Sequence, residues 1–211
     1  MEKEFFNFNN IDPENEGADF IAMMSPDEED ESERTHESKE LSILPLRNTV
    51  LFPGVVIPIT VGRDKSVKLI KDAFKKNKII GVVSQKDALN DDPAVSDLYS
   101  IGTEALIIRM FRMPDGNTTA ILQGKRKIFI RESVKTSPYL VCMTDPVIDE
   151  KPKKNKETKA LISSIKEMAA KIIELSPNIP SEANFALKNI DSPNFLINFI
   201  SSNLNISVSE K

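Results

Sequence analysis

The sequence is poor in the side chains that most metal sites and many enzymes use. Its 211 residues include one cysteine, one histidine and no tryptophan. A lone cysteine cannot form an intramolecular disulfide, and zinc needs several Cys, His or carboxylate ligands, so we expect no disulfide and no metal site. Cys142 stands in an apolar, strand-like run and is expected to be a small buried hydrophobic residue. A single free cysteine fits the reducing chemistry of the cytoplasm.

Long apolar segments are also lacking. No run of about 18 or more apolar residues exists, so we expect no membrane-spanning helix and no membrane partner. The N-terminus is acidic and has no basic start followed by an apolar stretch, which argues against a secretory signal or a mitochondrial transit peptide. We therefore expect a cytoplasmic location.

Motifs for phosphate binding and catalysis are missing as well. A phosphate-binding loop needs Gly-x-x-x-x-Gly-Lys-Ser/Thr. Gly124 and Lys125 are the nearest candidates, but Thr119 takes the place of the first glycine and Arg126 follows the lysine. No short motif marks a Ser–Lys dyad, and no acid–base constellation is evident. We predict no catalytic residue and no cofactor in this chain.

Charge divides the chain near residue 40. Residues 1–40 contain 14 acidic and 3 basic side chains, a net charge of −11, whereas residues 41–211 contain 25 basic and 18 acidic ones, a net charge of +7. The run Asp27-Glu-Glu-Asp-Glu31 has no apolar period, so residues 1–40 are predicted to be a disordered acidic tail. The tail also contains Phe5, Phe6 and Phe8, which either dock on a partner or have no structure.

Residues 41–150 are predicted to form a β-rich domain with one helix. Short apolar, β-branched runs predict strands at 41–46, 55–61, 78–83, 101–113, 117–123, 127–134 and 139–144. Pro53-Gly54 suits a type II turn, and Pro58 places its strand at an edge or a bulge because proline has no N–H. A helix is expected to begin at Asp64 as N-cap and to end with Asn77 in the left-handed conformation.

The apolar period changes after a basic linker at 151–157. Beyond it, apolar residues recur every three or four positions and predict a long helix, at Leu161, Ile165, Met168, Ile172 and Leu175. Ser181 is expected to cap a second, short helix, and Ser192 with Pro193 a third. The apolar stripes of this helical subdomain, 158–211, have few partners. We therefore expect it to be truncated and to continue into further helices, pack on the β domain or dimerise.

A series of short motifs along the chain resembles a known family. In order they are Leu44-Pro-Leu-Arg-Asn-Thr-Val-Leu-Phe-Pro-Gly54, Pro58, Val61-Gly62-Arg63, Gln85-Lys86-Asp87, Leu98-Tyr-Ser-Ile-Gly-Thr103, Pro114-Asp115-Gly116 and Gly124-Lys125-Arg126. The ordered set resembles the N-terminal domain of ATP-dependent Lon proteases over about 105 residues from Leu41, and more loosely to Lys211. This sequence departs from the common pattern at Asn48, where an acidic residue is usual, and at Lys127.

The resemblance implies an α+β fold. In this fold a PUA-like, β-rich pseudo-barrel with one helix is followed by an α-helical segment that begins a bundle. It also implies a role in protein quality control that is non-catalytic in this fragment: recognition of unfolded or tagged protein substrates and support of hexamer assembly with other Lon subunits. In that family an ATPase module and a peptidase module with a Ser–Lys dyad come after this region.

Five residues are candidates for substrate binding. A receptor for unfolded proteins needs exposed apolar surface, and Met110, Phe111 and Met113 lie near the tip of the predicted hairpin. The alternative for these three is packing in the core or under the helical segment. Arg63 and Lys65 flank the helix start and could hold acidic substrate segments or the acidic tail, and the alternative is a solvated face.

Two further functions stay open from the sequence. Basic stretches favour a nucleic-acid-binding module, and they lie at 75–78, 125–127 and 151–156. Aromatic side chains for base stacking are few, with two tyrosines and no tryptophan, so we expect at most weak DNA binding. A stand-alone Lon-domain binding protein is the other alternative.

Overall fold

The computed structural model describes residues 37–113, 116–149, 152–153, 155–175 and 182–211. Within them the chain forms two compact units. A β-rich unit comprises the residues up to Pro152 together with Asp191–Lys211, and a helical unit comprises Lys153–Ile190. The acidic tail, the turn at Pro114-Asp115 and the cap at Ser181 lie outside the described residues, so what the sequence predicts for them stays a prediction.

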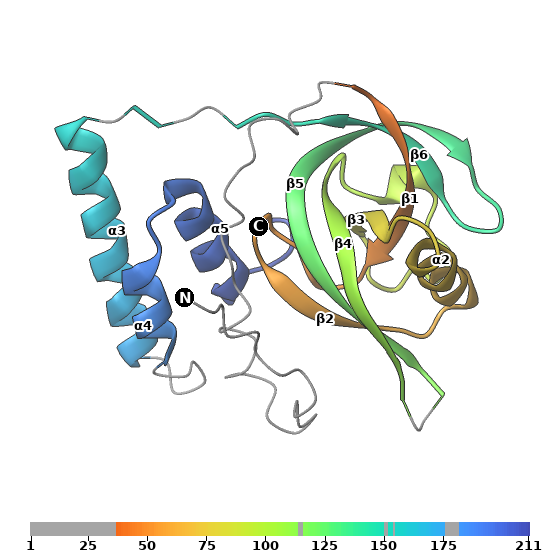
Figure 1. The fold of residues 1–211 in the computed structure, drawn as a ribbon, viewed down its shortest axis with the longest axis horizontal. Coiled ribbons are helices and arrows are strands. Elements are labelled where there is room, and N and C mark those ends of the chain that lie inside the picture. The colour runs from red at the N-terminus through yellow and green to blue at the C-terminus, as the bar shows by residue number, and fades with distance from the viewer. Residues whose placement is uncertain (1–36, 114–115, 150–151, 154, 176–181) are drawn as a thin grey trace, which may run out of the picture. The chain divides into compact units, whose positions relative to one another are not determined.

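Six strands form the sheet of the β-rich unit (Figure 1), namely β1 (Lys39–Leu46), β2 (Val56–Val61), β3 (Ile79–Ser84), β4 (Ile101–Arg112), β5 (Thr118–Lys135) and β6 (Val141–Pro146). The strand order is β2-β5-β4-β3-β1-β6, and β6 also pairs with β5. Strands β1 and β3 run parallel, and the other pairs are antiparallel. The β5–β6 pairing closes a barrel, and β2 extends the sheet from β5 as an edge strand.

Strand β5 is one long curved element rather than the two strands that the sequence predicts. In its ladder with β4, Glu104 pairs with Arg126 and Ala105 pairs with Gly124, so the register shifts at Lys125 and β5 forms a bulge there. The sequence predicts that one strand ends at residue 123 and the next begins at residue 127, and this prediction is wrong. A bulge bends and twists a strand without ending it, which allows β5 to pair first with β2 and later with β6.

Helix α2 (Asp64–Phe74) packs on β1, β3 and β4 through Leu69, Ile70 and Ala73. The barrel encloses an apolar cluster formed by Leu41, Ile43, Val83, Leu98, Ile128, Ile130, Leu140 and Cys142. Complete burial of one such aliphatic side chain stabilises the fold by roughly 1.5–3 kcal/mol. Cys142 is buried as predicted, and this burial raises the pKa of its thiol.

Both predicted ends of this helix differ by one residue from the observed ones. Arg63 is the N-cap residue, and its side chain makes no capping hydrogen bond, whereas Asp64 is the first helical residue. The Asp64 carboxylate still lies at the positive end of the helix dipole. Lys78, not Asn77, has the positive φ of 60°, and the Asn77 side chain instead accepts a hydrogen bond from the Ile79 N–H at 3.2 Å.

The turn before β2 has the predicted geometry. The Val55 N–H donates to the Phe52 carbonyl at 3.2 Å, and Gly54 has a φ of 80°, as the third position of a type II turn requires. Pro58 lies in the edge strand β2, as its missing N–H predicts.

Helix α5 (Pro193–Asn203) belongs to the β-rich unit. It begins as predicted, with Ser192 as N-cap accepting a hydrogen bond from the Phe195 N–H at 3.3 Å. The Phe195 ring packs on Gly54, and Asn198 Nδ2 donates to the Pro53 carbonyl at 3.1 Å. The predicted helical subdomain 158–211 stays a prediction as a unit, but its last helix packs on the turn before β2.

The helical unit contains α3 (Lys156–Leu175) and α4 (Glu182–Asn189), which contact each other. Lys166 Nζ donates to the Ile190 carbonyl at 2.7 Å, beyond the end of α4. The predicted long helix is confirmed. Most of its apolar stripe is exposed in the structure, at Leu161, Met168, Ile172 and Leu175. No helix in the described part of the chain is both long and apolar enough to cross a membrane.

A buried carboxylate joins three strands of the barrel. Glu104 on β4 has a side chain that is 9% exposed, and its two oxygens accept hydrogen bonds from Lys39 Nζ on β1 at 2.8 Å and from Arg126 Nε on β5 at 2.9 Å. Because both carboxylate oxygens are paired with cations, the charge is compensated inside the sheet.

We predict that Glu104→Ala destabilises the fold by about 3 kcal/mol, because it leaves two partly buried cations without their partner. Glu132→Ala is the matched control, since Glu132 lies exposed on β5. Equilibrium unfolding in urea measures both variants. Equal small losses for the two variants would contradict the role assigned to Glu104.

The contact between Gly54 and Phe195 of α5 can be tested with two glycines that both have a positive φ, Gly54 and Gly116. An alanine Cβ at Gly54 would lie 2.6 Å from the Phe195 ring, whereas one at Gly116, with a φ of 90°, would meet no atom within 4 Å. Both substitutions impose left-handed strain of roughly 1–2 kcal/mol. We expect Gly54→Ala to lower the free energy of unfolding by about 1–3 kcal/mol more than Gly116→Ala, from overpacking against Phe195. Losses of the same size would show that α5 adjusts freely.

Candidate functional site

One end of the sheet carries all five candidate residues. At this end Val61 of β2 pairs with Thr118 of β5, which pairs with Arg112 of β4. The β4–β5 hairpin projects here (Figure 1), and its described residues are closed by a hydrogen bond from the Met113 N–H to the Asn117 carbonyl at 2.9 Å. The chain leaves β2 through Gly62 and enters α2, so the hairpin and the helix start are joined by short stretches of backbone.

The hairpin exposes the apolar group Met110, Phe111 and Met113, which we name the tip surface. Further down β4 the strand is closed to solvent, since Ile107 is 0% exposed. Phe111 is 39% exposed, and Met110 and Met113 are half-buried. Phe111 lies opposite Thr119 on β5, so its ring has no aromatic cross-strand partner. Neighbouring residues of a strand point to opposite faces, so Phe111 and Met113 share one face of the hairpin and Met110 lies on the other. The tip surface is thus apolar, partly exposed and carried by the paired strands β4 and β5.

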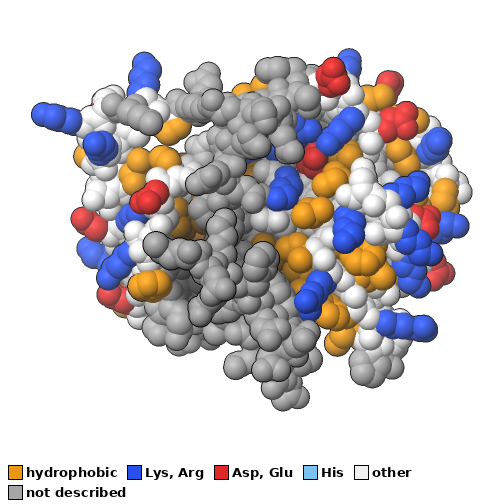
Figure 2. Space-filling model, in the orientation of Figure 1, with side chains coloured by type: hydrophobic (Ala, Val, Ile, Leu, Met, Phe, Trp, Pro, Cys, Tyr) orange, Lys and Arg blue, Asp and Glu red, His pale blue; other side chains and the backbone are white. Residues whose placement is uncertain are grey.

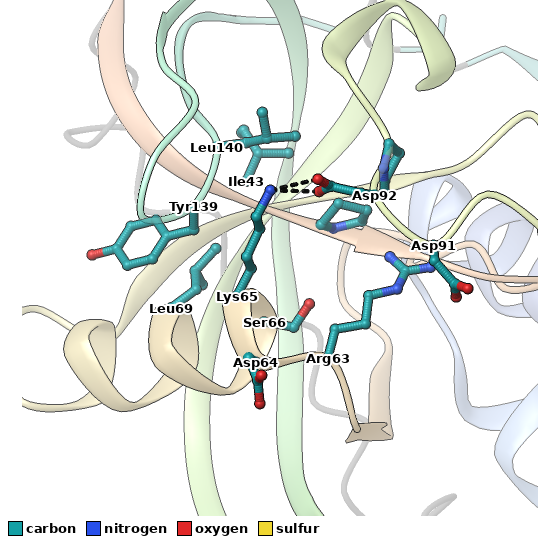
Figure 3. A pocket seen from close by; sticks show the side chains of 12 residues that line it. Ile43, Arg63, Asp64, Lys65, Ser66, Leu69, Asp91, Asp92, Tyr139 and Leu140 are labelled. Atoms are coloured by element: carbon teal, nitrogen blue, oxygen red, sulfur yellow. Dashed lines mark hydrogen bonds and ion pairs between the residues drawn. The ribbon is translucent and has the colours of Figure 1, made fainter.

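A second feature is a cavity of about 180 Å³ beside the start of α2, named here the α2 cavity (Figure 3). Its apolar lining comes from Ile43, Pro45, Leu69, Pro93, Tyr139 and Leu140. Its polar lining comes from Arg63, Asp64, Lys65, Ser66, Asp91 and Asp92. An apolar surface with charged groups at its edge suits a side chain of a bound polypeptide.

Lys65 forms an exposed ion pair at the edge of this cavity. Its Nζ lies 2.6 and 2.7 Å from the two carboxylate oxygens of Asp92, and both side chains are more than half exposed (Figure 3). An exposed pair of this kind contributes about 0–1 kcal/mol to stability. A ligand charge can therefore replace either partner at small cost.

Arg63 has a different position. Its guanidinium donates to Gln85 Oε1 at 2.6 Å and to the Asn90 carbonyl at 3.2 Å, so it holds the loop that follows β3. Burial lowers the pKa of Arg63, and the nearby charge of Arg47 lowers it further, whereas Asp91 and Asp92 oppose the shift. The geometry makes Arg63 a positioning residue for the loop.

The sequence did not point to Tyr139, which lies on the other side of the cavity. Its hydroxyl donates to Asp72 Oδ2 of α2 at 3.3 Å. Burial and the Asp72 carboxylate raise the pKa of Tyr139, and a hydrogen bond with Ser42 acts in the opposite direction. A tyrosine next to a proline carries no local signal of this contact. The run Asn90-Asp-Asp-Pro93 is a turn pattern that follows a strand, and it could have indicated the edge of the cavity that Asp91 and Asp92 form.

The structure brings Arg63 and Lys65 together at the α2 cavity, whereas no residue of the tip surface lines that cavity. The basic stretch 125–127 is engaged elsewhere, since Arg126 pairs with Glu104 and Lys127 with Asp149. Among the residues that the structure describes, no group of three or more His, Cys, Asp or Glu side chains could hold a metal ion.

Comparison with known families identifies the chain. Residues 40–211 match the model of the substrate-binding domain of ATP-dependent protease La, or Lon. The chain belongs to this family of Lon substrate-binding domains, which confirms the resemblance carried by its motifs. It is 54% identical to the Lon protease of Flavobacterium johnsoniae over 92% of its length, and 46% identical to that of Cytophaga hutchinsonii over 93%. It spans about a quarter of the length of these relatives, 24% of each.

Solved structures give the same fold. The N-terminal domain of a Mycobacterium avium complex Lon protease matches with a TM-score of 0.64 at 19% identity, covering 82% of this chain and 87% of that one. A Lon N-terminal domain protein from Xanthomonas campestris matches with a TM-score of 0.50 at 21% identity, covering 79% and 99%. The predicted α+β fold with a β-rich barrel is therefore confirmed.

The different roles of Arg63 and Lys65 can be separated. We predict that Arg63→Met speeds amide hydrogen exchange in residues 85–92 by at least about tenfold, because the Asn90 carbonyl and Gln85 lose a shared charged donor worth roughly 1.5–3 kcal/mol. Lys65→Met is the control and should leave exchange in this loop nearly unchanged, since its ion pair is exposed. Mass spectrometry of exchange measures both, and unchanged exchange in Arg63→Met would contradict the positioning role.

Proposed function

We propose that this chain recognises protein substrates for a Lon-type, ATP-dependent serine protease. Membership of the Lon substrate-binding family supports the class of activity, and the exposed tip surface supports a site for it. The ATPase and peptidase modules, the association with other Lon subunits into a hexamer and the cytoplasmic location are parts of the same proposal. The chain itself would bind and position substrates without catalysis.

The tip surface is the part of the proposed site that would distinguish unfolded from folded proteins. Unfolded chains differ from folded ones mainly in exposing apolar side chains. Met113 on the face of Phe111, and Met110 on the opposite face, suit varied partners, because the unbranched methionine side chain adapts its shape. The ladder beneath them is already formed, so binding would order few groups of the domain itself.

The α2 cavity is proposed as a second point of contact. Lys65 and Asp92 could each pair with an opposite charge on a substrate, while the apolar lining takes an adjacent side chain. In this arrangement Arg63 contributes indirectly, by holding the loop that carries Asp91 and Asp92. Charged and apolar contacts in one short stretch would favour some substrate segments over others.

DNA binding is the weaker alternative. It needs basic side chains free to contact phosphates. Arg126 and Lys127 already form ion pairs within the chain, so the exposed lysines at 75–78 are the remaining candidates among the three basic stretches for which the structure gives a position in the β-rich unit. No observation favours it over protein recognition, and the experiment below includes it as an outcome.

The test is a fluorescence-anisotropy titration of the full 211-residue chain at about 150 mM salt, where surface charges are partly screened. One probe is a labelled, permanently unfolded polypeptide, and the other is a labelled duplex DNA. We expect saturable binding of the polypeptide and weak, salt-sensitive binding of DNA. Tight DNA binding without polypeptide binding would overturn the proposal.

The chain offers a matched pair of phenylalanines for locating the site. Phe111 at the tip is 39% exposed, and Phe129, paired with Ile101 at the far end of β4, is 41% exposed. We predict that Phe111→Ser weakens polypeptide binding by about tenfold, consistent with roughly 1.4 kcal/mol of lost apolar contact. Phe129→Ser should have little effect. Equal effects would show that the tip surface is not the site.

A further inference from the structure

Helix α2 and the residues after it carry an exposed row of lysines. Lys68, Lys71 and Lys75 recur at spacings of three and four residues, which places them on one face of a helix, and Lys76 follows directly. All four are exposed, and we name them the lysine face. Figure 2 shows basic side chains gathered on the side of the β-rich unit where α2 lies.

The lysine face differs from the basic stretch 125–127 in its ion pairing. Among the described residues, no acidic side chain forms an ion pair with any of the four lysines. Arg126 and Lys127, in contrast, are each paired with a carboxylate. Asp72 and Asp64 are the acidic residues within four positions of these lysines. Asp72 accepts a hydrogen bond from the Tyr139 hydroxyl, whereas Asp64, in the first turn of α2, is that close in sequence to Lys68 alone. Two carboxylates among four lysines leave this face with an excess of positive charge.

The chain itself contains the complementary charge. Residues 1–40 have a net charge of −11, and five consecutive acidic side chains occupy Asp27-Glu-Glu-Asp-Glu31. Seven residues lie between Glu31 and Lys39, the first residue of β1, which makes eight Cα–Cα steps. Extended, they span about 26–29 Å at roughly 3.3–3.6 Å per residue.

This reach is sufficient to bring the acidic run to α2. Three residues of strand, about 10 Å, separate Lys39 from Ser42. The Tyr139 hydroxyl donates to Asp72 of α2, and Ile43 of β1 lines the same cavity as Tyr139 and Leu69 of α2, so β1 lies beside the middle of this helix. Lys71 is the neighbour of Asp72 along the helix. A segment tethered this closely acts at an effective concentration of the order of millimolar.

We propose that the acidic run Asp27–Glu31 docks on the lysine face of α2 in the same chain. The contact is electrostatic: five carboxylates meet four ammonium groups that form no ion pair with the described residues. The docked run makes the acidic tail an intramolecular competitor for any anionic partner of α2, such as an acidic polypeptide segment. This inference does not depend on the tip surface or on the proposed protease function.

A spin label placed beside the acidic run tests the contact. Ser32→Cys adds one reactive thiol, because the natural cysteine, Cys142, is 0% exposed and does not compete for the label. At about 0.05 M salt we expect the label to broaden the amide signals of residues 68–76. At about 1 M salt, where the screening length falls to roughly 3 Å, the broadening should disappear. Broadening at residues 125–127 or in α3 instead, or none at all, would overturn the proposal.

Two sets of variants make the test specific. Replacing the four lysines of the lysine face by Gln should abolish the broadening. The same change at four exposed lysines elsewhere, Lys135, Lys153, Lys159 and Lys171, should preserve it. If both sets abolish it, the attraction depends on net charge alone and the docking site is wrong.

A second measurement uses binding rather than spectroscopy. Neutralising Asp27–Glu31 as amides should strengthen binding of a labelled polyglutamate peptide by at least about threefold at low salt, because a tethered competitor is removed. The matched control neutralises five other acids of the tail, Glu2, Glu4, Asp12, Glu14 and Glu16. Equal strengthening by both variants, or none, would contradict docking by the run at 27–31.

Discussion

The barrel depends on one strand, β5, which hydrogen bonds with three neighbours along its 18 residues. Strand β4 pairs along most of the length of β5, β2 pairs with its first part and β6 with its last part, and closing the sheet through β6 requires a bend in β5. The bulge at Lys125 supplies it, and Gly124 beside the bulge allows close approach of the turn before β2, whose Gly54 N–H donates to the Gly124 carbonyl at 2.9 Å. Glu104, opposite the bulge, fixes the bend by pairing with cations on β1 and β5.

The same constraint places the candidate site. Because the first part of β5 pairs with β2 and β4, the β4–β5 hairpin and the end of β2 reach one end of the sheet together. The chain then turns directly from β2 into α2, so the tip surface, Arg63 and Lys65 are set by the strands rather than by flexible connections. Function-bearing residues at element ends, held by a rigid sheet, are a common arrangement for recognition.

Several turns, strand positions and helix ends could be predicted from the sequence because each depends on a few neighbouring residues. The type II turn at Pro53-Gly54, the edge position of Pro58 and the start of α5 at Ser192 each depend on one or two residues. The uninterrupted β5 was missed, since a bulge is decided by the ladder partner and not by the strand itself. The α2 cavity was missed for a related reason: Tyr139 and Asp92 come from loops that only the closed barrel brings to the helix. The exposed tip residues were predicted, but their role in binding stays a proposal.

Helix α2 concentrates several kinds of contact because it packs on three barrel strands, β1, β3 and β4. Its Leu69 and Ile70 face inward, its first turn lines the cavity, and its lysines face solvent. Salt affects the inner and outer faces differently. Apolar burial is insensitive to moderate salt, whereas salt screens the attraction of the exposed lysines for negative charges. Salt can therefore change what the outer face binds without altering how the helix is held. An acidic segment of the same chain is the partner for which this separation matters most, since its concentration at the helix is fixed by the tether and only the screening varies.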